Sequence, residues 1–188
     1  LLGGGIPRGN IILWSSGSGI GKSTGALYVC LSYCVQGFKV LYLDYEGGVN
    51  DNQLKGIGLF KYKYDKKHNP NGTFFVFRVH TYRDAEVFLN ELHDMIDLVV
   101  IDSVTSILPS KFLNKSKASI EDVNIGVDSK LVGNLLRRYK YEAIKNGTSW
   151  ILINQVRTKI RFIGMSTTEE AGGNALKHYP DIRISMIE

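Results

Sequence analysis

The chain has 188 residues, which suits one domain with a sizeable core, and 44% of them are hydrophobic, as in ordinary globular proteins. Its 23 lysines and arginines exceed its 18 acidic residues, and the formal charge of +5 permits nucleic-acid binding without establishing it. No apolar run approaches the roughly 20 residues that cross a bilayer, and no signal peptide is visible. We therefore expect a cytoplasmic protein with no membrane partner.

Strand-like and helical segments alternate along the chain. Apolar runs predict strands at 11–14, 39–43, 74–79, 98–101, 150–153 and 182–184, and apolar residues at helical spacing predict helices at 22–35, 50–57, 85–96 and 126–145. Continuous apolar strands that alternate with helices indicate an α/β fold, with a mostly parallel central sheet and helices on both faces. We expect residues 1–188 to form a single domain.

Two segments stand outside this alternation. Residues 60–73 interleave aromatic residues with lysines before an Asn-Pro-Asn-Gly turn, which predicts a small surface ribbon. Residues 109–122 are polar and lysine-rich, which predicts a mobile loop.

Cys30 and Cys34 lie four apart on a predicted helix, on the side of its apolar residues. We expect them to pack in the core without a disulfide, as suits a reducing compartment.

Residues 16–23, Ser-Gly-Ser-Gly-Ile-Gly-Lys-Ser, resemble the P-loop pattern G-x-x-x-x-G-K-[ST] and lie between a strand and a helix, as a P-loop must. The glycines allow backbone amides to turn toward phosphate oxygens, and the helix N-terminus adds partial positive charge. Ser16 at the first position departs from the pattern. The predicted nucleotide-binding residues are Ser16, Gly17, Ser18, Gly19, Ile20, Gly21, Lys22, Ser23 and Thr24, together with Asp102.

Two acidic residues follow buried strands. Asp102 ends the run 98–101, and an acid there would hold Mg²⁺ together with the Ser23 hydroxyl. Glu46 follows the strand 39–43, and parallel strands end at one edge of a sheet, so Glu46 can face the terminal phosphate as a general base. The expected cofactors are ATP and Mg²⁺.

A basic segment follows the strand 150–153. Arg157 and Lys159 supply cations, and the segment ends in a glycine pair, so it can place amides and charges beside a polyanion. We expect a DNA-binding loop whose contact residues are Arg157, Lys159, Ile160, Gly172, Gly173 and Asn174.

On these motifs the chain resembles the ATPase core of the RecA recombinase family, bacterial or phage. Residues 4–9 are similar to the family's lead-in to the P-loop, and 44–46 to its D-A-E motif. Residues 153–157, Ile-Asn-Gln-Val-Arg, resemble I-N-Q-I-R, and 172–177 match G-G-N-A-L-K. This last pair of motifs is the most specific.

The resemblance implies roles for individual residues. Lys22, Glu46 and Gln155 would be catalytic, with Gln155 sensing the γ-phosphate and coupling it to a second DNA-binding loop at 156–173. The first DNA-binding loop would include Ile125 and Gly126, followed by Lys130 and Arg137 on the next helix; seven residues apart, these two cations share one helical face. Lys177 and Arg183 would approach the nucleotide of a neighbouring subunit.

The sequence also departs from the family. Gln53 stands where the family has an adenine-stacking tyrosine, Asn50 replaces an acid that contacts the base, and Glu169 adds a negative charge within the second DNA-binding loop. Segment 60–73 is longer than its counterpart, and the N-terminal oligomerisation arm and the C-terminal region are expected to lie outside these residues.

The function implied is a DNA-dependent ATPase that forms filaments on single-stranded DNA and pairs it with duplex DNA for strand exchange in recombination and repair. One alternative is a ring motor of the RadA or helicase type, although no K-N-R-F-G motif is found. Another is a paralogue that binds nucleotide without hydrolysing it, which the serine at the first P-loop position leaves open. A small-molecule kinase lacks a recognisable acceptor pocket.

Overall fold

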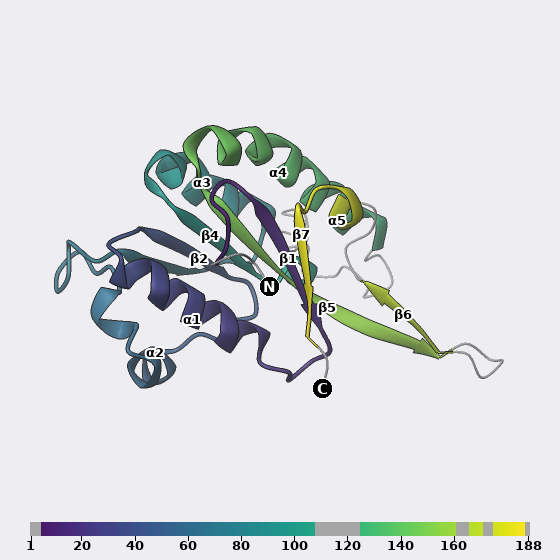
Figure 1. Ribbon diagram of the computed structural model, residues 1–188, viewed down its shortest axis with the longest axis horizontal. Helices are drawn as coiled ribbons and strands as arrows, with labels where there is room; N and C mark the ends of the chain where they lie inside the picture. Colours follow the sequence, from purple (N-terminus) through teal and green to yellow (C-terminus); the bar gives the residue numbers. More distant parts are fainter. Residues whose placement is uncertain (1–4, 108–124, 161–165, 171–174, 187–188) are drawn as a thin grey trace, which may run out of the picture.

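A computed structural model describes residues 5–107, 125–160, 166–170 and 175–186. Six parallel strands form a sheet in the order β3-β2-β4-β5-β1-β7, which confirms the predicted α/β fold with a parallel central sheet (Figure 1). A further strand, β6, pairs with β5 in antiparallel fashion. The bounds are β1 Ile11–Ser16, β2 Val40–Asp44, β3 Phe74–Arg78, β4 Leu98–Asp102, β5 Ser149–Ile160, β6 Ser166–Glu170 and β7 Ile182–Ser185.

Helices cover both faces of the sheet. Figure 1 shows α1 and α2 on one face and α3, α4 and α5 on the other. The bounds of the α-helices are α1 Lys22–Val35, α2 Asp51–Ile57, α3 Tyr82–Leu92, α4 Ile125–Asn146 and α5 Ala175–His178, and short 3₁₀ turns cover Phe60–Tyr62, His93–Met95 and Val104–Ser106. No helix in the described part of the chain is long and apolar enough to span a bilayer.

The core has two layers because neighbouring residues of a strand point to opposite faces. Leu41 and Leu43 join the layer under α3 and α4, whereas Val40 and Tyr42 join the layer under α1. This two-sided burial explains why the central strands β2 and β4 are buried along their whole length rather than at alternate positions. Cys30 and Cys34 are buried in the α1 layer without a disulfide, as predicted, and burial raises the pKa of the Cys34 thiol to about 11.

Most predicted elements agree with the structure to within two residues, and α1 agrees at both ends. The helix predicted at 85–96 is shifted: it begins at Tyr82 and ends at Leu92. Its start is fixed by a capping box in which the Asp84 amide donates to the Thr81 hydroxyl at 3.2 Å and the Thr81 amide donates to the Asp84 carboxylate at 2.8 Å. Apolar periodicity alone does not detect such a cap.

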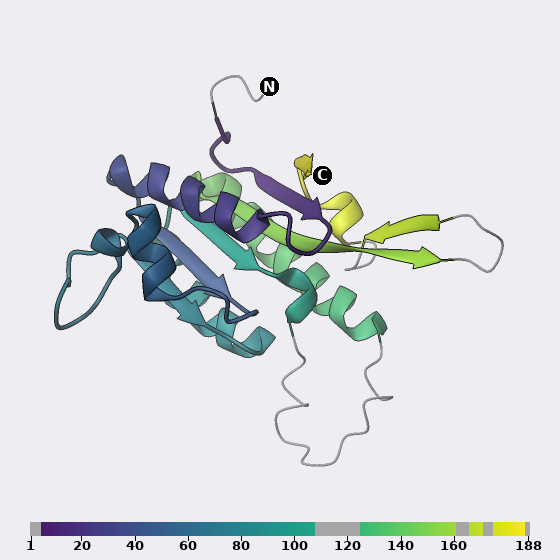
Figure 2. The same cartoon turned by 90° about the horizontal axis from the view of Figure 1, so that it is seen from below.

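The segment after residue 153, which is predicted to be a loop, is a β-strand in the structure. β5 continues to Ile160, and β6 returns along it with Val156 opposite Glu170 and Ile160 opposite Ser166, so the two strands make a hairpin that extends past the edge of the sheet (Figure 2). The β-branched residues Val156, Thr158 and Ile160 favour this extended conformation. Pairing with β6 then satisfies backbone groups that a loop would leave open.

The surface ribbon predicted at 60–73 does not form regular strands. The segment begins with the turn Phe60–Tyr62 and is then held by the isolated bridges Lys63↔Phe74 and Asp65↔Asn69, without a regular strand of its own. The mobile loop predicted at 109–122 lies outside the described residues.

Candidate functional site

The carboxyl ends of the parallel strands form one row at one edge of the sheet. Ser16 at the end of β1 is the register partner of Gln155 on β5, and Asp44 at the end of β2 is the partner of Asp102 at the end of β4. Residues far apart in the sequence are thereby brought to a single edge, where ligands bind in open α/β sheets.

The P-loop turns from β1 into α1 at this edge. Gly19 has φ of 79° and Gly21 has φ of 90°, a left-handed conformation that favours glycine, so the backbone can make the turn that directs amides into the site. Lys22 opens α1, and only 7% of its surface is exposed.

The Lys22 ammonium is held by the loop itself. It donates to the Ser16 carbonyl at 3.1 Å, to the Ser16 hydroxyl at 3.0 Å and to the Gly17 carbonyl at 2.6 Å. Burial lowers the pKa of Lys22, while the charges of Glu46 and Asp102 act in the opposite direction. The serine at the first P-loop position thus supplies an additional acceptor to the lysine.

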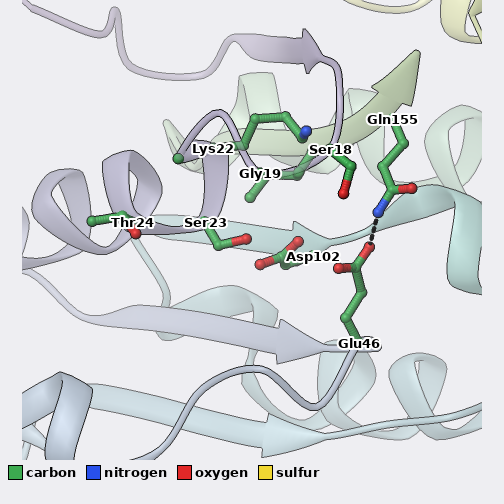
Figure 3. Close-up of a pocket in the computed structure, with 10 residues that line it drawn as sticks. Ser18, Gly19, Lys22, Ser23, Thr24, Glu46, Asp102 and Gln155 are labelled. Carbon is green, nitrogen blue, oxygen red and sulfur yellow. Dashed lines mark hydrogen bonds between the residues drawn. The ribbon is translucent and has the colours of Figure 1, made fainter. Parts of the chain in front are cut away.

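Asp102 is a buried carboxylate at the end of β4, with 3% of its surface exposed. Its Oδ2 accepts a hydrogen bond from the Tyr42 hydroxyl at 2.6 Å, and its Oδ1 is buried without a hydrogen-bond partner among the described residues. Burial raises the pKa of Asp102, and the hydrogen bond from Tyr42 opposes that rise. Figure 3 shows the Ser23 hydroxyl and the Asp102 carboxylate directed toward one another.

Glu46 is tied into the site through one of its two oxygens. Its Oε1 accepts from the Gln155 amide at 2.8 Å and from the Ser103 hydroxyl at 2.7 Å (Figure 3 draws the first of these). Ser103 is fully buried, and its oxygen also lies 2.8 Å from the Thr105 hydroxyl. The structure therefore brings together Glu46 and Gln155, which are 109 residues apart in the sequence, and adds Ser103 as a second donor to the same oxygen of Glu46.

The turn that carries Glu46 is held by Asp44, another residue to which the sequence assigned no role. The buried Asp44 carboxylate accepts from the amides of Gly47 at 2.7 Å, Gly48 at 3.3 Å and Val49 at 3.1 Å. Arg78 at the end of β3 donates to the Gly47 carbonyl at 2.7 Å. An aspartate followed by a Gly-Gly pair is the sequence signal that indicates such a turn.

A cavity of about 250 Å³ lies between these groups. Most of the predicted nucleotide-site residues line it; Ser16, Gly17 and Ile20 do not, and Ile153 is an unpredicted apolar member. The lining residues are Ser18, Gly19, Gly21, Lys22, Ser23, Thr24, Glu46, Asp102, Ile153 and Gln155.

The predicted DNA-binding residues lie elsewhere. Arg157, Lys159 and Ile160 are on the hairpin strand β5, while Ile125, Gly126 and Lys130 are in the first turns of α4. Arg137 is exposed farther along α4, and its Nε donates to the Tyr179 hydroxyl at 3.2 Å. Gly172, Gly173 and Asn174 lie outside the described residues.

The two residues predicted to lie at a subunit interface are both exposed. Lys177 is on α5, and Arg183 is on β7, where it donates to the Leu176 carbonyl at 2.6 Å. β7 is an edge strand of the parallel sheet, so Arg183 lies at the margin of the sheet.

A strand, a glycine-rich turn and a helix that opens with lysine and serine, next to an acid at the end of a neighbouring strand, define a P-loop nucleotide-binding protein. A model of the family described as RecA N-terminal domain matches residues 1–188. The RecA protein of Malacoplasma penetrans is 30% identical over 184 residues, which are 97% of this chain and 52% of that protein. RecA of Oleidesulfovibrio alaskensis is 28% identical over 187 residues, 97% of this chain and 49% of that protein.

The chain therefore belongs to the RecA N-terminal domain family, an ATP-binding core domain whose members are generally ATPases. It spans about half the length of the curated relatives that it matches.

Replacing Asp102 by asparagine tests how much the buried charge of Asp102 destabilises the fold. Because burial raises the folded pKa of Asp102 above its unfolded value, its ionisation destabilises the fold as the pH rises through that folded pKa. We expect Asp102→Asn to have a higher free energy of unfolding than the unchanged chain at pH 7, with a smaller difference near pH 4. Urea unfolding at both pH values measures this, with the exposed Glu91→Gln as control. A less stable Asp102→Asn chain at pH 7 would contradict it.

Proposed function

We propose that this chain is the single ATPase core domain, residues 1–188, of a recombinase that binds and hydrolyses ATP, assembles on single-stranded DNA and exchanges strands with a duplex. The observation that carries the proposal is the hydrogen bond between Glu46 and Gln155. Gln155 lies on β5, the same strand that continues into the basic hairpin, so one element joins the phosphate cavity to the proposed DNA contact.

The cavity fits the phosphate end of a nucleotide. At about 250 Å³ it is smaller than the pockets that enclose a whole drug-sized ligand, so the base would lie outside it. The amides of the P-loop and the N-terminus of α1 would meet phosphate oxygens, and Lys22 would move from its loop acceptors to the terminal phosphates. Asn50, which stands where the family has an acid that contacts the base, accepts from the Gln53 amide at 3.0 Å and so caps α2. This residue therefore has a structural role of its own.

The residues at the edge also fit Mg²⁺. The buried Oδ1 of Asp102, which has no partner among the described residues, needs a donor or a cation, and the Ser23 hydroxyl points toward this carboxylate. In the described part of the chain no three metal-ligating side chains gather, but Mg²⁺ usually takes only one or two protein ligands and completes its shell with phosphate and water. Ser23 and Asp102 would hold the ion, which would neutralise charge on the phosphates.

Glu46 would act as the general base. Ser103 and Gln155 engage its Oε1, and none of the described residues donates to Oε2, so that oxygen can take the proton of an attacking water. Asp44 fixes the turn behind Glu46 and restricts the directions in which its carboxylate can point. Gln155 would exchange its bond to Glu46 for one to the γ-phosphate, and this exchange would alter the base of the hairpin.

The hairpin is the proposed contact with single-stranded DNA. Arg157 and Lys159 supply two cations on β5, and contacts of that kind address phosphates without reading sequence. Binding is expected to be salt-sensitive and largely indifferent to sequence. Lys177 and Arg183 are proposed to face the nucleotide of the next protomer in a helical filament.

The rate of ATP hydrolysis with and without single-stranded DNA, together with electron microscopy, tests the function as a whole. DNA-stimulated hydrolysis with filaments supports a recombinase. Rings would indicate a motor of the helicase type, and binding without turnover would indicate a paralogue that only binds nucleotide.

Lys22→Ala is expected to abolish ATP binding, since the ammonium is the one described side-chain cation lining the cavity. Fluorescence titration with a labelled ATP analogue measures the loss, and Lys145→Ala, an exposed lysine at the end of α4, is the control. Unchanged affinity in Lys22→Ala would remove the P-loop assignment.

Glu46→Gln is expected to retain ATP binding and to slow hydrolysis by about 10²- to 10⁴-fold, the usual worth of a general base. Ser103→Ala should lower kcat by about 10- to 100-fold with little change in KM, because a buried hydrogen bond to the carboxylate contributes about 1.5–3 kcal/mol. Steady-state kinetics distinguish the two, with the exposed Ser32→Ala as control. A Ser103→Ala enzyme with unchanged kcat would show that the hydroxyl does not position Glu46.

Arg157→Ala combined with Lys159→Ala is expected to weaken single-stranded DNA binding and to reduce the slope of log K against log salt by about 1.4, at about 0.7 per phosphate contact. Fluorescence anisotropy over a salt series measures this. Lys39→Ala combined with Lys145→Ala removes the same charge from exposed positions away from the hairpin. Equal slopes for the two double variants would exclude the hairpin as the DNA site.

A further inference from the structure

Segment 60–73 presents lysines on a turn that is held firmly in place. The Asn69 side chain donates to the carbonyls of Lys61 and Lys63, each at 3.0 Å, and the Tyr64 amide donates to the Phe74 carbonyl at 2.8 Å. Gly72 approaches Tyr64 so closely that an added Cβ would lie 2.6 Å from its Cα. These contacts close the turn on itself and fix it against β3.

The cations of this segment have few acidic partners. Lys61, Lys66 and Lys67 are exposed, and none of the described acidic side chains pairs with them. The one acid within the segment, Asp65, accepts from the Lys67 amide at 2.8 Å and the His68 amide at 3.0 Å, so its carboxylate serves the turn.

Cations elsewhere on the described surface are often paired with acids. Arg8 contacts Asp97 at 2.6 Å, and Lys140 contacts Asp181 at 3.0 Å. Of the lysines in the segment, only Lys63 pairs with a described carboxylate, that of Asp51 at 2.7 Å, and the His68 ring lies 3.1 Å from the Asp65 carboxylate. The segment is therefore a local excess of positive charge on a rigid support, which suits a polyanion.

The aromatic residues of the segment are engaged within the protein. The Phe60 ring has Lys55 at 4.9 Å and Lys63 at 5.9 Å from its centroid, and Tyr64 stacks on Phe75 at 4.9 Å. Proteins that hold single strands stack the bases on open aromatic faces. Here the available chemistry is charge alone, which favours the denser phosphate array of a duplex.

The segment and the β5–β6 hairpin lie at opposite ends of the longest axis of the molecule, and both views agree on this (Figures 1 and 2). A DNA strand on the hairpin of one protomer therefore does not run along the segment of the same protomer. We propose that residues 60–73 form a second DNA-binding surface, which contacts the phosphate backbone of a duplex separate from the strand on the hairpin. The inference rests on the proposed function only in naming DNA as the polyanion.

Lys66→Ala combined with Lys67→Ala tests the surface. The probe is a fluorescent DNA duplex of about 30 base pairs, and no nucleotide is added to the assay. Fluorescence anisotropy over a salt series measures the affinity of the intact chain for this duplex. We expect the variant to bind at least about fivefold more weakly at low salt and to lose about 1.8 from the salt slope, at about 0.9 per phosphate. The charge-matched control is Lys39→Ala combined with Lys145→Ala.

Equal behaviour of the two double variants would overturn the inference, as would no measurable duplex binding by the unchanged chain. A loss confined to the Lys66 and Lys67 variant would support it. The assay omits nucleotide and uses a duplex, so it is separate from the measurement of single-stranded DNA binding by the hairpin variant. If the Lys66 and Lys67 variant keeps its duplex binding, this inference fails while the proposed function stands. If the hairpin variant keeps its binding to single strands, the proposed function fails while this inference stands.

Discussion

The parallel pairing of β1, β5, β4 and β2 determines where every group of the candidate site lies. Parallel strands end at the same edge, and their register places Ser16 beside Gln155 and Asp44 beside Asp102. The backbone reinforces this arrangement, because the Tyr45 amide donates to the Asp102 carbonyl at 2.6 Å and holds the turn after β2 against the end of β4. A shift of either strand by one residue would turn these side chains to the opposite face.

Charges gathered in this row are stabilised in different ways. Lys22 is nearly buried but donates to three oxygens of its own loop, and Asp44 accepts from three backbone amides. Asp102 has one donor, Tyr42, and an unpaired oxygen. A buried carboxylate with incomplete hydrogen bonding is costly, and such groups concentrate where a ligand completes them. The least satisfied member of the row is thus the one that faces Ser23.

Much of the fold and part of the site follow from the sequence. Unbroken apolar strands and the phosphate-loop spacing predict the parallel sheet, α1 and the neighbourhood of Lys22 and Asp102, because these depend on local pattern. Ser103 and Asp44 gain their roles only from contacts across the fold or from the shape of a turn, which periodicity does not encode. The regular strands of the hairpin do not follow from apolar runs, because β5 begins as a buried apolar strand and continues as a polar one, and its partner β6 contains no apolar run.

β5 is the strand that connects the phosphate cavity to the basic hairpin. Its first half is buried in the sheet, Gln155 stands at the margin, and its second half pairs only with β6. Asn154, next to Gln155, is fully buried, and its side chain finds no hydrogen-bond partner among the described residues; the same holds for the hydroxyl of Ser15, its register partner on β1. A buried polar group without a partner costs about 1–3 kcal/mol, so a rearrangement that supplied a partner to Asn154 would be favoured. The proposed exchange of Gln155 from Glu46 to the γ-phosphate would act on the residue next to this unsatisfied amide, at the point where β5 leaves the parallel sheet.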